Sequence, residues 1–241
     1  MSDFVNQSGV MIISGGQTGV DIAGLRAGHC LGFRTGGWAP RGFRTQAGLK
    51  PKLGSVFNLR EHSGGYTART WKNVDASSVT LIIAADANSA GTKMTINACD
   101  ELNAPYRVVL LTPLNKPGHL TYDVPGTEVQ RGLLDWIKEE SAKGISEYGM
   151  FAINVAGNSS VTAPGIFPSA FLFLFALFGR LYIERTQELG GTPNERMLQL
   201  SQRLFNPNAA QGLADSYEYY PDLDLRRASL LVDGDFTRVA A

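Results

Sequence analysis

The chain has 241 residues, of which 44% are apolar and 18% charged, enough for one large α/β domain or for one domain with a helical annex. Its 22 basic and 22 acidic residues give zero formal net charge, which argues against a nucleic-acid-binding protein, because such proteins usually carry a basic excess. Cys30 and Cys99 have apolar neighbours and are expected to be buried free thiols, and the three histidines lack metal-site spacing, so we expect no protein-built metal site.

The first elements predict a strand that runs through glycines into a helix. Residues 10–13 are a short apolar run, typical of a buried parallel strand. Residues 19–31 place apolar side chains at helical spacing, and residues 32–38 follow as a short second strand and turn. Residues 39–78 are rich in Gly, Pro, Arg, Ser and Thr, and only residues 55–59 resemble a strand there. Such a long irregular stretch inside a domain is usually functional.

The remainder of the chain alternates strands with helices. Strands are predicted at 79–84, 107–111 and 151–155. Helices are predicted from the turn Gly91-Thr92 to about residue 103 and at about 128–142, 166–189 and 194–204. This alternation favours an α/β fold with a Rossmann-like, doubly wound, mainly parallel sheet. We expect one ligand-binding domain over residues 1–189 and a C-terminal helical extension or tail over residues 190–241.

Two segments bear on cellular location. Residues 1–9 are polar and lack the basic and apolar regions of a signal peptide. Residues 166–178 are almost all apolar, but this run is shorter than the roughly 20 residues that a membrane span needs. We therefore expect a buried helix and a soluble, cytoplasmic protein without a membrane partner.

The segment Gly15-Gly16-Gln17-Thr18-Gly19-Val20-Asp21 carries the strongest functional signal. A strand that enters glycines and then a helix gathers free backbone N–H groups and the positive helix end at one point, which suits a phosphate. Gly15 and Gly16 allow an anion to approach the backbone, and Thr18 adds a hydroxyl donor. Asp21 either meets a ribose hydroxyl or holds the loop. The alternative interpretation is a tight turn without a ligand.

The spacing of these glycines separates the segment from two common nucleotide motifs. It reads Gly-Gly-x-x-Gly, unlike the dinucleotide fingerprint Gly-x-Gly-x-x-Gly, and residues 35–37 offer no carboxylate for a ribose. The sequence also lacks the Walker spacing Gly-x-x-x-x-Gly-Lys-[Ser/Thr]. Hydride transfer and ATP hydrolysis are therefore disfavoured.

Residues 12–21 resemble the opening motif of the YpsA-related molybdenum carrier proteins, members of the SLOG superfamily. The similarity continues, in type and order, at residues 36–42, 66–74, 91–95, 154–157 and 164–166, so that it covers roughly residues 10 to 185. It implies a Rossmann-like fold that binds molybdenum cofactor, which is a pterin phosphate, or a nucleotide-derived compound.

Three positions depart from the patterns of these relatives. Ala39 stands where the family typically has cysteine, and Ala90 stands at the first glycine of a Gly-Gly-Thr stretch. Some members of the superfamily cleave nucleotide N-glycosidic bonds with a glutamate, and Thr95 occupies that position. Because threonine cannot act as a carboxylate base near neutral pH, the resemblance favours binding over catalysis, and we assign no catalytic residue.

Further ligand-binding candidates follow from the predicted topology. In an open parallel sheet the ligand lies beyond the carboxyl ends of the strands, where loops 14–21, 36–45, 84–95 and 154–165 are expected. Arginine forks suit phosphate oxygens, whereas a surface pair or a loop brace is the alternative for each candidate. Trp38 either stacks on a base or pterin or packs internally. Beyond the Gly-rich segment the candidates are Trp38, Arg41, Arg44, Arg69, Asn73, Gly91, Thr92, Lys93, Asn154 and Gly157.

The sequence thus predicts a non-catalytic carrier, sensor or sequesterer of a phosphate-bearing ligand, either nucleotide-derived or of the molybdopterin type. The alternatives are a sponge for an ADP-ribose-type immune second messenger, a nucleotide N-glycosidase or phosphohydrolase, and a degenerate domain that serves assembly only. The phenylalanines of residues 166–189 favour helix packing or a subunit interface, and a homo-oligomer is expected.

Overall fold

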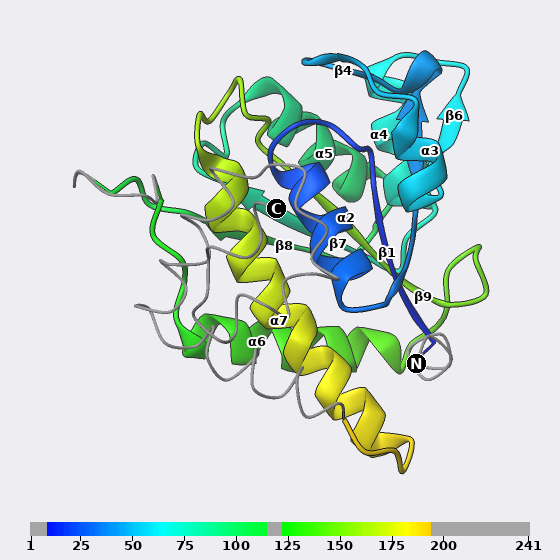
Figure 1. Cartoon of the computed structure of the whole chain (residues 1–241), viewed down its shortest axis with the longest axis vertical. Coiled ribbons are helices and arrows are strands. Elements are labelled where there is room, and N and C mark those ends of the chain that lie inside the picture. Colours follow the sequence, from blue (N-terminus) through cyan, green and yellow to red (C-terminus); the bar gives the residue numbers. More distant parts are fainter. Residues whose placement is uncertain (1–8, 115–121, 194–241) are drawn as a thin grey trace, which may run out of the picture.

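The central feature of the structure is a five-stranded sheet between two layers of helices (Figure 1). The computed structural model describes residues 9–114 and 122–193. All neighbouring strands of the sheet pair in parallel, and their order is β2-β1-β9-β7-β8. The predicted Rossmann-like α/β fold is therefore confirmed. The strands are β1 (Val10–Ser14), β2 (Arg34–Gly36), β7 (Val79–Ala84), β8 (Tyr106–Leu110) and β9 (Phe151–Gly157).

Three helices cover one face of this sheet: α2 (Val20–Cys30), α6 (Thr127–Ser141) and α7 (Ile166–Glu188). The alternation of side chains along β1 directs Ile12 toward this layer, where it joins the main hydrophobic cluster. Two glycines of α2 bring the helix close to the sheet. A Cβ atom on Gly24 would lie 2.6 Å from the Val155 side chain, and one on Gly28 would lie 2.7 Å from the Ile12 side chain.

The other face of the sheet is covered by α4 (Tyr66–Asp75) and α5 (Ala90–Glu101). Met11 and Ile13 of β1 point to this side, opposite to Ile12. Cys99 is fully buried between these layers, and burial raises the pKa of its thiol to about 11, so this cysteine is an unreactive packing residue. Both cysteines are free thiols, but only Cys99 is buried as the sequence predicts, because Cys30 is half-buried at the end of α2.

The segment 37–62 differs from its prediction. The short strand expected within residues 32–38 is present as β2, and the chain leaves this strand at Gly37. The φ of 118° at Gly37 is readily adopted only by glycine, and the missing side chain leaves room for the Ser14 carbonyl. The expected strand over residues 55–59 is wrong, because these residues lie in a helix and in a turn at Asn58. The segment contains β3 (Trp38–Pro40), the 3-10 turn η1 (Arg41–Phe43), β4 (Arg44–Thr45), β5 (Gly48–Leu49), α3 (Lys52–Phe57) and β6 (Arg60–His62).

The apolar helix α7 is longer than the apolar run that predicts it. It is the one described helix that is long and apolar enough to cross a membrane, but 78% of its most apolar window is buried inside the protein. Phe173 and Phe178 are completely buried, and the Phe178 ring meets Phe33 edge-on at a centroid distance of 6.2 Å. We interpret α7 as a core helix, as expected. The described chain continues to residue 193, so the expected helix 194–204 and most of the expected extension 190–241 lie outside the described residues.

The position of α7 can be tested by removing one of its buried rings. Phe173→Ala should lower the free energy of unfolding by about 3–5 kcal/mol, because it removes a large buried side chain and leaves a cavity. Leu189→Ala is the control, since Leu189 is 53% exposed and its replacement should cost no more than about 0.5 kcal/mol. Urea unfolding of both variants measures the difference. Equal losses would contradict the core assignment of α7.

Candidate functional site

The parallel strands bring several loops and helix starts to one edge of the sheet. Strands β1, β7 and β9 end at Ser14, Ala84 and Gly157, and each is followed by a loop that leads into a helix. The N-terminal ends of α2, α5 and α7 therefore lie at the same edge, where their partial positive charges favour anions. Open parallel sheets bind ligands at this edge. The candidate site is built from these loops together with the start of α4.

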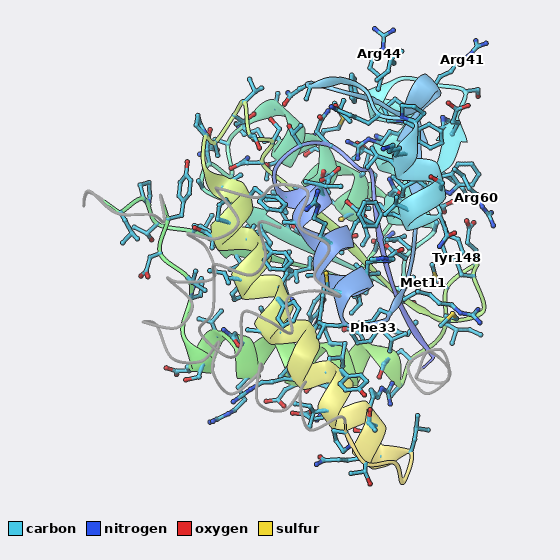
Figure 2. All side chains as sticks on the ribbon, viewed as in Figure 1. Met11, Phe33, Arg41, Arg44, Arg60 and Tyr148 are labelled. Carbon is cyan, nitrogen blue, oxygen red and sulfur yellow. The ribbon has the colours of Figure 1, made fainter. Side chains whose placement is uncertain are left out.

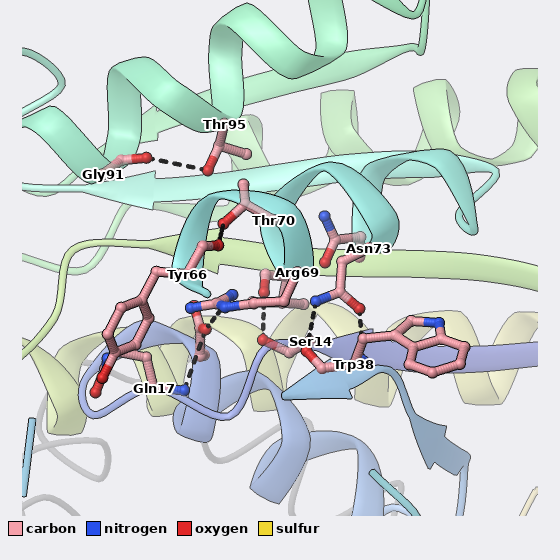
Figure 3. A network of polar contacts seen from close by, with 12 residues as sticks. Ser14, Gln17, Trp38, Tyr66, Arg69, Thr70, Asn73, Gly91 and Thr95 are labelled. Atoms are coloured by element: carbon pink, nitrogen blue, oxygen red, sulfur yellow. Dashed lines mark hydrogen bonds and ion pairs between the residues drawn. The ribbon is translucent and has the colours of Figure 1, made fainter. Parts of the chain in front are cut away.

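Arg69 and Asp21 form a buried ion pair across the Gly-rich loop, residues 15–19. The Arg69 Nη1 atom lies 3.2 Å from Asp21 Oδ2, and the two side chains are 11% and 5% exposed. Figure 3 shows Arg69 reaching from α4 toward this loop. Its guanidinium lies so close to Gly15 that a side chain at that position would occupy the same space. Gly15 is thus needed for the approach of an internal cation.

The Asp21 carboxylate occupies a position that suits an anion. Its Oδ2 atom accepts a hydrogen bond from the backbone N–H of Gln17 at 3.2 Å. Burial raises the pKa of the Asp21 carboxyl above its ordinary value, while Arg69 and the backbone N–H groups act in the opposite direction. In the structure Asp21 holds the loop, which is one of the two roles that the sequence leaves open for this residue.

Gln17 and Thr18 connect the Gly-rich loop to the turn between β4 and β5. The Gln17 Oε1 atom accepts hydrogen bonds from the backbone N–H of Thr18 at 3.0 Å and of Gln46 at 2.8 Å. The Thr18 hydroxyl donates to Gln46 Oε1 at 3.4 Å. A Cβ atom on Gly16 would lie 2.7 Å from the Leu59 side chain, so Gly16 faces the 37–62 segment. The loop is therefore held on one side by apolar packing and on the other by the hydrogen bonds to the side-chain amide oxygens of Gln17 and Gln46.

Asn158 organises the loop that precedes α5, and sequence reasoning missed it. Its Oδ1 atom accepts hydrogen bonds from the backbone N–H groups of Ala85 and Asp86, both at 2.8 Å. Its Nδ2 atom donates to Ser89 Oγ at 2.9 Å and to Thr92 Oγ1 at 3.0 Å. The Asn158 carbonyl also accepts from the backbone of α2. A polar residue directly after a buried strand is the signal that could have found it.

The first turn of α5 is open toward solvent. No described residue accepts a hydrogen bond from the backbone N–H groups of Ala90, Gly91 and Thr92, as is usual for the first turn of a helix. A Cβ atom on Gly91 would meet nothing within 4 Å, and Lys93 is exposed beside it. The Thr92 side chain is buried and fixed by Asn158. This turn offers unpaired N–H donors and one cation to a ligand.

The Asn73 side chain of α4 is joined to the backbone of Trp38 in β3 by two hydrogen bonds. Asn73 accepts from the Trp38 backbone N–H at 2.8 Å and donates to the Trp38 carbonyl at 2.9 Å, so both polar atoms of its amide are used internally (Figure 3). The Trp38 ring is half-buried, and the Arg60 guanidinium carbon lies 5.7 Å from its centre. Arg60 also lies 5.9 Å from the ring of Tyr148, and Figure 2 shows both residues on the same side of the molecule. The Trp38 ring thus packs against the Arg60 side chain.

The remaining candidates are dispersed. Arg41 and Arg44 are exposed and point away from the body of the protein, as Figure 2 shows. Asn154 is buried within β9 and donates to Thr80 Oγ1 at 3.2 Å, inside the sheet rather than at its edge. Gly157 ends β9 at the edge, close to the backbone of β7. The structure therefore brings together Gly15–Gly19, Asp21 and Arg69 on one side, and Gly91, Thr92, Lys93 and Gly157 around Asn158 on the other.

The contribution of the ion pair to the free energy of unfolding can be tested by removing the Arg69 guanidinium. Arg69→Ala leaves the Asp21 carboxylate buried without its counter-ion, and breaking such a pair costs about 3–5 kcal/mol near pH 7. The pKa of Asp21 then rises further above its unfolded value, so the loss is largest at neutral pH and shrinks as the pH falls toward 4.

Urea unfolding of the variant and the parent protein between pH 4 and pH 7 measures this dependence. Arg41→Ala is the matched control, because Arg41 is exposed and its loss should change stability by no more than about 0.5 kcal/mol. A destabilisation of Arg69→Ala that is independent of pH would argue against an unpaired Asp21 charge as its cause.

Comparisons with known proteins agree with this architecture. Residues 12–178 match the circularly permutated YpsA SLOG family. Among solved structures, the chain is similar to the "Putative molybdenum carrier protein" from Syntrophus aciditrophicus, with a TM-score of 0.55 and 25% sequence identity, over 70% of this chain and 93% of that chain. No match was found among curated proteins. Since the matched region makes up well over half of its length and the resemblance in the sequence is thereby confirmed, the chain belongs to the circularly permutated YpsA SLOG family.

Proposed function

We propose that this protein binds a phosphate-bearing small molecule, nucleotide-derived or of the pterin type, and carries or sequesters it without converting it. The main support for this proposal is the open first turn of α5. Three backbone N–H groups there lack a described acceptor, Gly91 leaves space above them, and Lys93 adds a positive charge. Helix N-termini with free N–H groups are established phosphate-binding positions in proteins.

The rigid support of this turn favours specific binding. Asn158 fixes Ser89 and Thr92 at the start of α5 and the backbone of residues 85 and 86 before it. A site whose donors are held in place loses little conformational freedom when a ligand binds. The name of the structural neighbour from Syntrophus aciditrophicus supports a molybdenum-related ligand of the molybdopterin type as one candidate.

Binding without turnover is the part of the proposal that rests on Thr95. This residue stands where nucleotide-cleaving members of the superfamily carry glutamate, and its buried hydroxyl donates to the Gly91 carbonyl at 3.2 Å. A hydroxyl used in this way supplies no general base. We further propose that the protein acts in the cytoplasm as a homo-oligomer. Because four of the five phenylalanines of α7 are buried in the core and only Phe167 is partly exposed, an interface formed by this helix would have to use its exposed and partly exposed residues.

The proposal predicts that a side chain on Gly91 abolishes binding while the fold persists. Gly91→Leu should be tolerated, since its Cβ meets open space, but the side chain would cover the N–H groups of the turn. Gly132→Leu in α6 is the matched control, because Gly132 is also an exposed helical glycine with no atom within 4 Å of its Cβ.

Mass spectrometry of small molecules released by denaturing the purified proteins identifies the ligand, and calorimetry with that molecule measures affinity. We expect at least about tenfold weaker binding for Gly91→Leu, which corresponds to about 1.4 kcal/mol, and unchanged binding for the control. Wild-type affinity in Gly91→Leu would contradict the assignment of the turn. Chromatography of the ligand after incubation should show it intact, and conversion to products would make the protein an enzyme.

A further inference from the structure

Strand β8 forms one edge of the central sheet, and its outer side is unpaired among the described residues. The Pro105 carbonyl and the Leu111 N–H are hydrogen-bonded to β7. Because backbone direction alternates along a strand, the N–H and C=O groups of Tyr106, Val108 and Leu110 point away from the sheet. No described residue forms a hydrogen bond with these groups of Val108 or Leu110. The edge therefore offers donors and acceptors to another strand.

The side chains along this edge are apolar where they are exposed. Val108 and Leu110 are 37% and 59% exposed, on the face opposite to Val109, which is buried against α6. Edge strands that remain alone usually carry lysine, proline or a bulge that discourages pairing. The five residues of β8 include neither lysine nor proline. This edge is thus suited to a partner strand rather than to solvent.

Neighbouring segments limit the free edge to the five residues of β8. Before the strand, the chain turns out of α5, and the Ala104 N–H donates to the Cys99 carbonyl at 2.9 Å. After the strand, the Asp123 N–H donates to the Thr112 carbonyl at 2.8 Å, so residues 122–123 take up the outer side there. At the opposite edge of the sheet, β2 has three residues, of which two are buried. Strand β8 is the longer and more exposed edge.

We propose that a second copy of this chain pairs with β8, antiparallel and about a two-fold axis through Val108. In this register the two Val108 residues exchange backbone hydrogen bonds, and Tyr106 of each copy lies opposite Leu110 of the other. The free edge is used over its full length, and these pairs are aromatic–aliphatic and aliphatic–aliphatic, without opposed like charges. The two sheets would then form one continuous sheet.

The chemistry of the edge favours a second copy over a charged partner. Arg107 is the one charged residue of β8, and its guanidinium carbon lies 4.9 Å from the centre of the Trp136 ring in the same chain. It also donates to the Tyr106 carbonyl at 3.2 Å, and this oxygen keeps a second lone pair for a partner strand. The inference specifies the homo-oligomer that is part of the proposed function, and it does not depend on the ligand.

A pair of cysteine variants tests the register. Val108→Cys places two thiols on the axis, where Cα atoms of a hydrogen-bonded pair lie about 5.5 Å apart, within the range of a disulfide. Leu110→Cys is the matched control, because its two copies would lie about 14 Å apart along the strands. After mild oxidation, we expect a disulfide-linked dimer from Val108→Cys only, with the parent protein as the background for Cys30 and Cys99. Random collisions would instead favour Leu110→Cys, which is the more exposed position.

Sedimentation velocity of the full chain tests the interface without a cross-link. Val108→Lys brings two positive charges together on the axis, and we expect the dissociation constant of the dimer to rise at least about tenfold. Val129→Lys is the control, because Val129 is 45% exposed on α6, away from the paired edge, and this variant should associate like the parent protein.

The outcomes separate this inference from the proposed function. A dimer that Val108→Lys does not weaken, or equal cross-linking of the two cysteine variants, would overturn the β8 interface while the homo-oligomer stands. A parent protein that is monomeric throughout the micromolar range would overturn both, and ligand binding would still be decided by Gly91→Leu. Should Val108→Lys fail to fold, as judged by circular dichroism, the two cysteine variants decide.

Discussion

The buried ion pair between Arg69 and Asp21 is the interaction on which the candidate site depends. It joins α4 to the first turn of α2 across Gly15, although the two residues are 48 positions apart in the sequence. Desolvating two charges is costly, and such a pair stabilises only when its geometry is good and its remaining donors and acceptors are satisfied. The additional bond from the Gln17 N–H to Asp21 meets part of this requirement and fixes the path of the loop.

An internal carboxylate at this place changes the interpretation of the Gly-rich motif. Glycine-rich turns before helices are usually associated with phosphate because their N–H groups are free. Here the Gln17 N–H is satisfied by Asp21, and Gly15 makes room for Arg69. The unpaired N–H groups lie one loop away, at the start of α5. The motif thus indicates the shape of the loop.

The parts of the fold that the sequence predicts correctly are those with strong apolar patterns. Strands β1, β7 and β9 are buried on both faces and appear as continuous apolar runs. Helix α4 has no counterpart among the predicted elements, because its buried residues are Thr70, Asn73 and Val74, which give almost no apolar stripe. Residues 55–59 resemble a strand in the sequence, but residues 55–57 form the end of α3 and Asn58 caps this helix. The roles of Asn73 and Asn158 depend on backbone groups far along the chain, and no local pattern encodes those contacts.

The order of strands in the sheet has a consequence for biosynthesis. Among the described strands of the sheet, β9 is the last to be synthesised, yet it pairs with both β1 and β7 in the middle of the sheet. Until residue 157 has been made, β1 and β7 each lack a neighbour and leave apolar strand edges open to intermolecular pairing. Pairings that span so much of the sequence also form slowly. The nascent chain therefore passes through a stage in which most of its core residues are synthesised but the sheet still lacks its central strand. Protection by chaperones at that stage would matter more than for a sheet whose strands are added in sequence order.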